Sequence, residues 1–148
     1  MDKSVMWQFD SYMQELFQMQ EVDIKEYSPL TLAFIGDGIY DLIIRTLIVN
    51  RGNKQVQKLH LETSALVNAG TQSKMMRTLQ EHLTEEEHAV YKRGRNTRVN
   101  SVPKNADLGD YHAATGLECS FGWLYLHARH DRINELFSII MENHIDAT

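Results

Sequence analysis

Apolar residues recur along most of this chain at intervals of three and four, the spacing that places side chains on one face of an α-helix. The first such run predicts an amphipathic helix over about residues 5–20, with an apolar face formed by Met6, Phe9, Met13, Leu16 and Phe17. No segment alternates apolar and polar residues with a period of two, and no hairpin turn is recognisable. The pattern therefore predicts an all-α fold, a helical bundle.

The most apolar run of the chain follows Ser28 and Pro29. Serine can cap a helix and proline suits its first turn, while the tripeptide Asn50-Arg51-Gly52 predicts where this helix ends. Residues 54–80 form a second long periodic run. That run is compatible with one long helix or with two helices that meet near Gly70, and the pattern leaves both open.

Polar residues mark the beginning of the next helix. Thr84 followed by Glu87 matches a capping box, which predicts a short helix that ends near Gly94. The acidic triplet at 85–87 is interpreted as a capping and helix-dipole device rather than a metal site. Residues 95–103 lack an apolar period and are predicted to form a loop.

Two more helices are predicted after this loop. Asn105 or Asp107 can cap a long helix that runs to about Ala128, and Asp131 can cap a last one. The whole chain has 148 residues, which suffices for one domain with its own core but not for two comfortable ones. We therefore expect a single domain over residues 1–148.

Composition narrows the class of protein further. The one cysteine, Cys119, cannot form an intramolecular disulfide, and no charged-then-apolar signal segment opens the sequence. The most apolar run is interrupted by Asp37, Asp41 and Arg45, so no membrane span is expected. These features predict a cytoplasmic protein without a membrane partner.

Charge is unevenly distributed along the chain. The net charge of −5 argues against general adhesion to nucleic acid, yet the segment between His88 and Asp107 contains five cations and no acid. Arginine forks suit phosphate oxygens, and few aromatic residues accompany them, which favours a duplex backbone over stacked single-stranded bases. A solvated surface loop is the alternative. The candidate RNA-binding residues of this segment are Arg93, Arg95, Asn96, Arg98 and Lys104.

Two acids interrupt apolar helices between glycines. Asp37 lies between Gly36 and Gly38, and Glu118 lies between Gly116 and Gly122. Helices that pack closely through glycines could bring these acids together, and converging carboxylates suit Mg²⁺ and phosphate chemistry. Acids that reach solvent or pair with a base such as Arg45 are the alternative. The histidines and the cysteine form no zinc-binding pattern.

These segments resemble a known family. Residues 34–40, Phe-Ile-Gly-Asp-Gly-Ile-Tyr, resemble the hallmark segment of ribonuclease III endonuclease domains, and Glu118 with Gly122 resembles the second acidic motif of that family. Residues 93–96 and the Val-Pro-Lys-Asn run at 102–105 resemble Mini-III, the short branch without a double-stranded-RNA-binding domain. The resemblance covers about residues 22–143, which leaves 1–21 as an N-terminal helical extension.

The resemblance implies roles for individual residues. Asp37 matches the metal-binding aspartate of the first motif and Glu118 the metal-binding glutamate of the second, so both are expected to be catalytic. Asp41 is a candidate auxiliary acid, with an ion pair to a nearby base as the alternative. The chain departs from full-length ribonuclease III at Ala33 and Thr115, where that family carries acids. Two missing carboxylates are expected to weaken metal binding.

The resemblance also implies an activity. It predicts a homodimeric, Mg²⁺-dependent endoribonuclease that cleaves double-stranded RNA by attack of a metal-activated water, leaving 5′-phosphate and 3′-hydroxyl ends. Precursor 23S ribosomal RNA is the implied substrate, with a ribosomal protein as a possible assistant. Two rivals from other classes stay open at this point: a non-catalytic RNA-binding scaffold, given Ala33 and Thr115, and an all-α nucleotide pyrophosphohydrolase.

Overall fold

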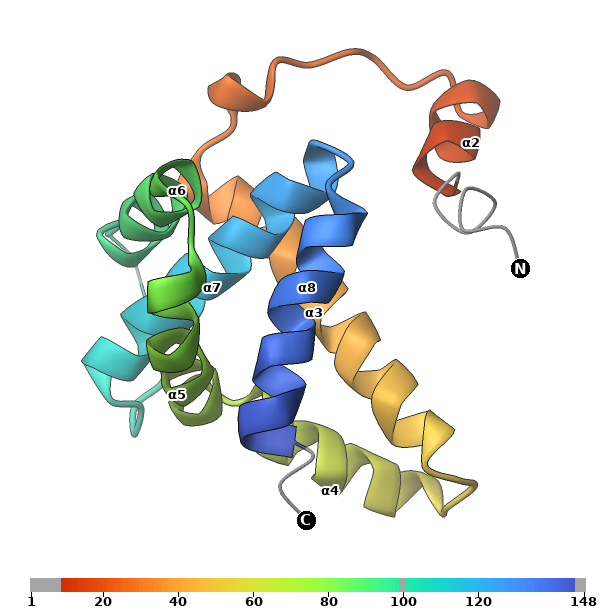
Figure 1. The fold of residues 1–148 in the computed structure, drawn as a ribbon, viewed down its shortest axis with the longest axis vertical. Helices are drawn as coiled ribbons and strands as arrows, with labels where there is room; N and C mark the ends of the chain where they lie inside the picture. The colour runs from red at the N-terminus through yellow and green to blue at the C-terminus, as the bar shows by residue number, and fades with distance from the viewer. Residues whose placement is uncertain (1–8, 99–100, 146–148) are drawn as a thin grey trace.

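The structure is a computed structural model that describes residues 9–98 and 101–145. Helices account for all the regular structure in these two segments, with no strand among them, so the all-α prediction is confirmed (Figure 1). In chain order the elements are α2 (Phe9–Leu16), the 3₁₀ turn η1 (Ile24–Glu26), α3 (Pro29–Asn50), α4 (Val56–Val67), α5 (Ala69–Leu79), the 3₁₀ turn η2 (Gln80–His82), α6 (Glu85–Arg95), α7 (Leu108–Leu126), α8 (His130–Ile140) and the π-helical turn η3 (Met141–Ile145).

Local capping explains where three of these helices begin. The Ser28 hydroxyl accepts a hydrogen bond from the Thr31 amide, and the Asp107 carboxylate accepts one from the Asp110 amide. Thr84 and Glu87 form the reciprocal capping box that starts α6. These starts are as predicted, and Asp107 rather than Asn105 caps α7. The end of α3 at Asn50 also agrees with the prediction, and Gly52 follows it with a positive φ of 130°.

Two helix boundaries, the junction of α4 with α5 and the start of α8, could not be placed from the spacing of apolar residues. Residues 54–80 form two helices, but they separate at Asn68, whose extended backbone ends α4 and whose side chain caps α5 by accepting from the Thr71 amide. The prediction that Asp131 caps the last helix is wrong. The turn after α7 is short, with Ala128 at a positive φ of 56°, so α8 already begins at His130 and Asp131 falls in its first turn.

The first helix is shorter than predicted. Within the described residues α2 ends at Leu16, because Gln18 adopts a positive φ of 51° that an α-helix cannot continue. Residues 5–8 of the predicted helix lie outside the described part of the chain. An extended segment joins α2 to η1, and α2 lies apart from the bundle (Figure 1).

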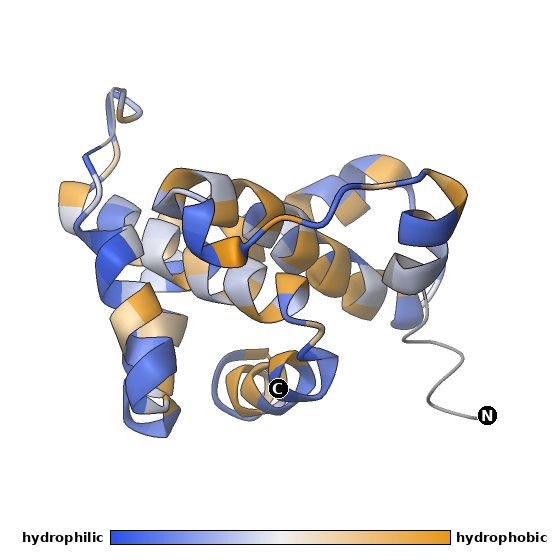
Figure 2. Cartoon of the chain, turned by 90° about the horizontal axis from the view of Figure 1, so that it is seen from above, coloured by the Kyte–Doolittle hydropathy of each residue, from blue (hydrophilic) through white to orange (hydrophobic). Residues whose placement is uncertain are grey.

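The core surrounds α7, which packs most extensively against α3, α6 and α5. The rings of Tyr40, Phe121 and Phe137 meet in tilted contacts, with centroids 5.6–6.2 Å apart. The Tyr40 hydroxyl has a hydrogen-bond partner in the core, because it donates to the Leu66 carbonyl over 2.7 Å. Hydrophobic residues gather where the helices face one another (Figure 2). Of the helices described, none is both long and apolar enough to cross a membrane.

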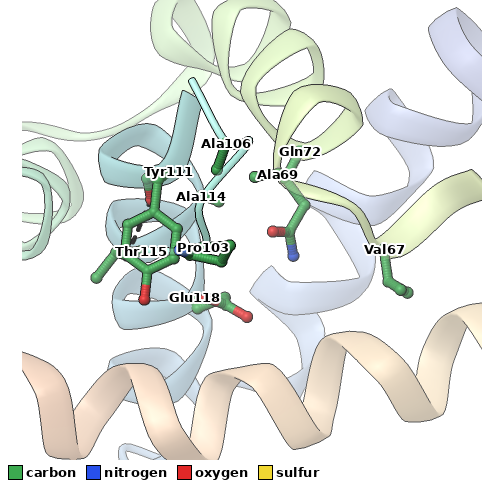
Figure 3. Close-up of a pocket in the computed structure, with 9 residues that line it drawn as sticks. All are labelled: Val67, Ala69, Gln72, Pro103, Ala106, Tyr111, Ala114, Thr115 and Glu118. Carbon is green, nitrogen blue, oxygen red and sulfur yellow. Dashed lines mark hydrogen bonds between the residues drawn. The ribbon is translucent and has the colours of Figure 1, made fainter. Parts of the chain in front are cut away.

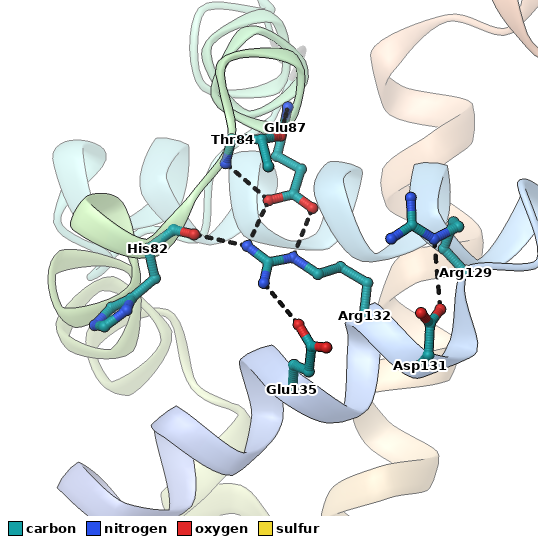
Figure 4. Close-up of polar contacts among 7 residues, drawn as sticks. All are labelled: His82, Thr84, Glu87, Arg129, Asp131, Arg132 and Glu135. Carbon is teal, nitrogen blue, oxygen red and sulfur yellow. Dashed lines mark hydrogen bonds and ion pairs between the residues drawn. The ribbon is translucent and has the colours of Figure 1, made fainter.

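A buried ion pair fixes α6 against α8 (Figure 4). Arg132 donates from two nitrogens to the buried Glu87 carboxylate at 2.8 and 2.9 Å, and it also donates to the His82 carbonyl over 2.6 Å. Burial raises the pKa of Glu87, but hydrogen bonds from Arg132 and Thr84 outweigh it and hold that pKa below its usual value. The acidic triplet thus has the structural role predicted for it, at least at Glu87.

Candidate active site at the contact of α3 and α7

Glycine backbones bring α3 and α7 into direct contact. A Cβ atom at Gly36 would overlap the backbone carbonyl of Glu118, and one at Gly122 would overlap the carbonyl of Leu32. Any larger residue at either position would force the helices apart. The close packing predicted from glycines is therefore present, but Gly38 takes no part in it, because a Cβ there would face open space.

This contact brings the two predicted acids together. Asp37 follows Gly36 on α3, and Glu118 supplies the carbonyl against which Gly36 packs. Burial raises the pKa of Glu118 to about 9, helped by a hydrogen bond and by charge repulsion from Asp37. The environments of the two acids differ, since Glu118 is half-buried and Asp37 is exposed. Asp37 therefore reaches solvent, which is one of the alternatives that the sequence left open for the acids.

The acid pair has the donor chemistry of a magnesium site. With a pKa near 9, Glu118 is neutral at pH 7 when no cation is near, and it can then donate a hydrogen bond to Asp37. A divalent cation would favour the charged forms of both carboxylates, and oxygen donors are the ligands that Mg²⁺ prefers. The described residues contain no group of three or more acid, histidine or cysteine side chains able to hold a metal. Asp37 and Glu118 would therefore leave most coordination positions to water or substrate.

The positions of the two missing acids offer no replacement ligand. Ala33 is buried in a small apolar cluster with Leu32, Val90 and Cys119. Thr115 is also buried, and its hydroxyl donates to the Tyr111 carbonyl one turn earlier on α7, over 2.9 Å. The site consequently rests on two carboxylates from the protein.

An open pocket of about 360 Å³ lies beside Glu118 (Figure 3). Its wall includes Pro103 and Ala106, which belong to the segment between α6 and α7. The basic segment therefore continues into residues that border the acid site. Across the pocket lies Gln72 of α5, whose amide faces the Glu118 carboxylate (Figure 3). The sequence pattern predicts no role at the site for Gln72.

Asp41 is engaged by a base on its own helix. Its carboxylate accepts from Arg45 Nε over 2.7 Å, one helical turn further along α3. Both side chains are partly exposed, and such a pair contributes little to stability. This ion pair is the alternative that the sequence left open for Asp41.

The candidate RNA-binding residues do not form one cluster. Arg93 is exposed at the end of α6 and lines a recess around Trp123 together with Lys25, His127 and Arg129. That recess shares no lining residue with the pocket beside Glu118.

Arg95 is held within the protein itself. Its guanidinium lies 5.6 Å from the centroid of the Tyr91 ring, and its Nε donates to Asn96 Oδ1 over 3.2 Å. Arg98 and Lys104 are exposed. Residues 99–100 of the predicted loop lie outside the described part of the chain.

The fold and the acid pair define a class of all-α proteins suited to metal-dependent phosphodiester chemistry. The ribonuclease III domain family matches residues 30–129, which include both acids. This chain belongs to the ribonuclease III family, and its similarity to proteins named Mini-ribonuclease 3 places it in the Mini-III branch. It is accordingly an endoribonuclease.

Three relatives define how far the similarity extends. Mini-ribonuclease 3 of Clostridium tetani is 43% identical over 120 residues, which cover 80% of each chain. Mini-ribonuclease 3 of a Thermoanaerobacter species is 35% identical over 142 residues, 96% of this chain and 97% of that one. The crystal structure of protein FN1578 from Fusobacterium nucleatum superposes with a TM-score of 0.75 at 32% identity, covering 83% of this chain and all of the other.

Proposed function

We propose that this endoribonuclease cleaves double-stranded RNA in a Mg²⁺-dependent reaction at the site formed by Asp37 and Glu118. The observation that carries the proposal is the convergence of these acids across the glycine contact of α3 and α7. The ribonuclease III family acts on double-stranded RNA with divalent cations, which supports the same assignment.

The protein's own residues divide the work of the reaction. Asp37 and Glu118 would hold the cation, and the α3–α7 contact would keep the two carboxylates close enough to do so. When bound, the cation supplies a water of lowered pKa as nucleophile and offsets charge that develops on the phosphodiester. Attack on phosphorus with departure of the 3′ oxygen leaves a 5′-phosphate and a 3′-hydroxyl. Because Asp37 is exposed, the reacting phosphate can approach from its side.

The experiment that tests this proposal is cleavage of a long RNA duplex with Mg²⁺, with EDTA, and by Asp37→Asn. We expect products only from the unmodified protein with Mg²⁺. Duplex binding without products at any Mg²⁺ or Mn²⁺ concentration would favour the scaffold alternative. Hydrolysis of small nucleotides with the duplex ignored would favour a pyrophosphohydrolase.

We further propose that the basic segment binds the RNA backbone. Pro103 and Ala106 border the pocket beside Glu118, so a phosphate held by their neighbour Lys104 would lie near the acids. Arg93, Arg95, Asn96 and Arg98 would hold the backbone further from the acids, since Arg93 lines a separate recess. Each of these side chains offers hydrogen-bond donors suited to phosphate oxygens. The recess that contains Arg93 would extend this surface along the side of α6.

The proposed substrate is precursor 23S ribosomal RNA in the bacterial cytoplasm, with a ribosomal protein assisting its placement. The sequence resemblance to the Mini-III branch suggests this choice. Incubation of the purified protein with precursor transcripts, alone and with ribosomal proteins, followed by mapping of the RNA ends tests it. Uniform cutting of any duplex would contradict a dedicated substrate.

We also propose that the working form is a homodimer. Leu30, Phe34 and Leu42 lie at intervals of four and eight along α3, and all three are exposed. An apolar stripe of this kind is costly to leave in water and is typical of an interface. Phe34 is the extreme case, with 82% of its surface accessible.

A further inference from the structure

Gln72 has a position that packing does not explain. It lies on α5 among Ala69, Met75, Met76 and Leu79, and only 3% of its surface is accessible. Its Nε2 makes no hydrogen bond of full geometry to any described residue. Burying an amide donor without a partner is unfavourable, so an apolar side chain of similar volume would suit this position better if packing were its only role.

The amide instead faces an acid. Glu118 lies between α5, which carries Gln72, and α3, which carries Asp37 (Figure 3). Gln72 lowers the pKa of Glu118, as a hydrogen-bond donor to its carboxylate would. Burial and Asp37 raise that pKa by a larger amount. An amide donor serves an ionised carboxylate without adding a charge of its own.

We propose that Gln72 is a positioning residue, whose Nε2 donates to the Glu118 carboxylate and holds it in the orientation that converges with Asp37. This inference rests on the proposed function, since it takes Glu118 as a metal ligand. It also accounts for a feature of this chain: with Ala33 and Thr115 in place of acids, only two carboxylates define the cation position. The orientation of the Glu118 carboxylate then depends on the neutral amide of Gln72.

Two other roles for Gln72 fit the structure less well. Its burial keeps it from touching an RNA duplex, so it is not a substrate contact. A role in packing alone predicts that methionine, which is unbranched and of similar length, would replace it without consequence for metal binding. The two hypotheses therefore differ in what Gln72→Met does.

The test measures Mn²⁺ binding to the RNA-free protein by calorimetry, together with the thermal unfolding midpoint. For Gln72→Met and Gln72→Leu we expect an unchanged or higher midpoint and a Mn²⁺ affinity lowered at least about tenfold, as is typical when residues that orient metal ligands are removed. Ser73→Ala is the matched control. Ser73 is the next residue of α5 and also buried, but it does not line the pocket beside Glu118, so its replacement leaves Mn²⁺ affinity unchanged.

Two results would overturn the inference. One is wild-type Mn²⁺ affinity in folded Gln72→Met, and the other is an equal loss in Ser73→Ala. Failure of the inference differs from failure of the proposed function. If Asp37→Asn and Glu118→Gln lose Mn²⁺ while Gln72→Met retains it, only the role of Gln72 is wrong. If the two acid variants also bind Mn²⁺ as the wild type does, the proposed metal site itself is wrong.

Discussion

Glu118 is the residue in which the demands of folding and of chemistry conflict. The fold half-buries it against α3 beside Asp37, which penalises its charged form and raises its pKa to about 9. Metal binding requires that charged form. If Glu118 binds a cation as proposed, the free energy of cation binding would offset the cost of burying its carboxylate, and the metal-free protein bears that cost whenever Glu118 ionises.

This conflict predicts a pH dependence of stability. Because the folded pKa of Glu118 lies above the unfolded value of 4.5, the folded state binds more protons between these limits, and the free energy of unfolding falls as pH rises from about 5 to 9. Glu118→Gln removes the titration, so its stability should fall less over that range. The difference should exceed about 1 kcal/mol, since one unit of pKa corresponds to about 1.4 kcal/mol. Urea unfolding in EDTA measures it, and parallel curves would contradict the assignment.

Some residues of the candidate site can be predicted from the sequence and others cannot, and Gln72 belongs to the second group. Asp37 and Glu118 interrupt apolar helices and match a family motif, so they were predicted. Gln72 also interrupts an apolar series, at positions 69, 72, 75, 76 and 79, but a polar residue on a helix has many explanations. Only the placement of α5 beside α7 reveals what its amide faces.

The contact between α3 and α7 determines the geometry of the site, and its glycines are unequal. Gly36 meets the Glu118 carbonyl, whereas Gly38 faces open space. We expect Gly36→Ala to destabilise the protein by roughly 1–3 kcal/mol through overpacking and to weaken Mn²⁺ binding by moving the acids apart. Gly38→Ala, its matched control, should be stabilising by about 0.5–1 kcal/mol, because alanine is the better helix former.

Chemical unfolding and Mn²⁺ titration of both alanine variants provide the measurement. Equal effects of Gly36→Ala and Gly38→Ala would mean that the close approach of α3 and α7 does not set the acid geometry. The sequence could not distinguish the two glycines, because the difference depends on where α7 lies.

Helix boundaries were predictable where their causes are local. Ser28, Thr84 and Asp107 cap their own helices, so a few neighbouring residues contain the whole signal. Asp131 resembled a cap equally well, yet the tight turn around Ala128 starts α8 before it. Such a turn is set by how α8 packs against the bundle, and the pattern of residues does not encode that packing directly.

For the molecule as a whole, RNA binding must overcome a net charge of −5. The proposed contacts are few and local, so affinity should depend steeply on salt. We expect Arg93→Ala and Arg98→Ala each to weaken binding to unrelated duplexes and to flatten the plot of log affinity against log salt by about one unit.

Arg77→Ala, at an exposed cation on α5, is the control for this prediction and should leave the slope unchanged. Arg95 is less suitable as a test, because its contacts with Tyr91 and Asn96 give it a structural role. Fluorescence anisotropy in Ca²⁺ or EDTA over a salt series provides the slopes. If the salt slopes of Arg93→Ala and Arg98→Ala equal that of the wild type while the variants lose stability, these arginines have a structural role and do not bind RNA.

The exposed stripe on α3 predicts how two copies associate. Phe34→Glu should convert the proposed dimer to a monomer, because a charge at this position would have to be buried in the interface. Leu61→Glu, at a similarly exposed position on α4, should leave the dimer intact. Light scattering after gel filtration distinguishes these outcomes. A wild-type protein that is already monomeric at micromolar concentration would contradict the dimer.

The proposed activity depends on Asp37 and Glu118 holding a divalent cation together. Crystals of the protein grown or soaked with Mn²⁺, examined by anomalous scattering, test it most directly. We expect an anomalous peak within ligand distance of carboxylate oxygens of both residues, a distance that is about 2.1 Å for the related ion Mg²⁺. Ordered Mn²⁺ elsewhere on the protein, with no peak between these two carboxylates, would contradict it.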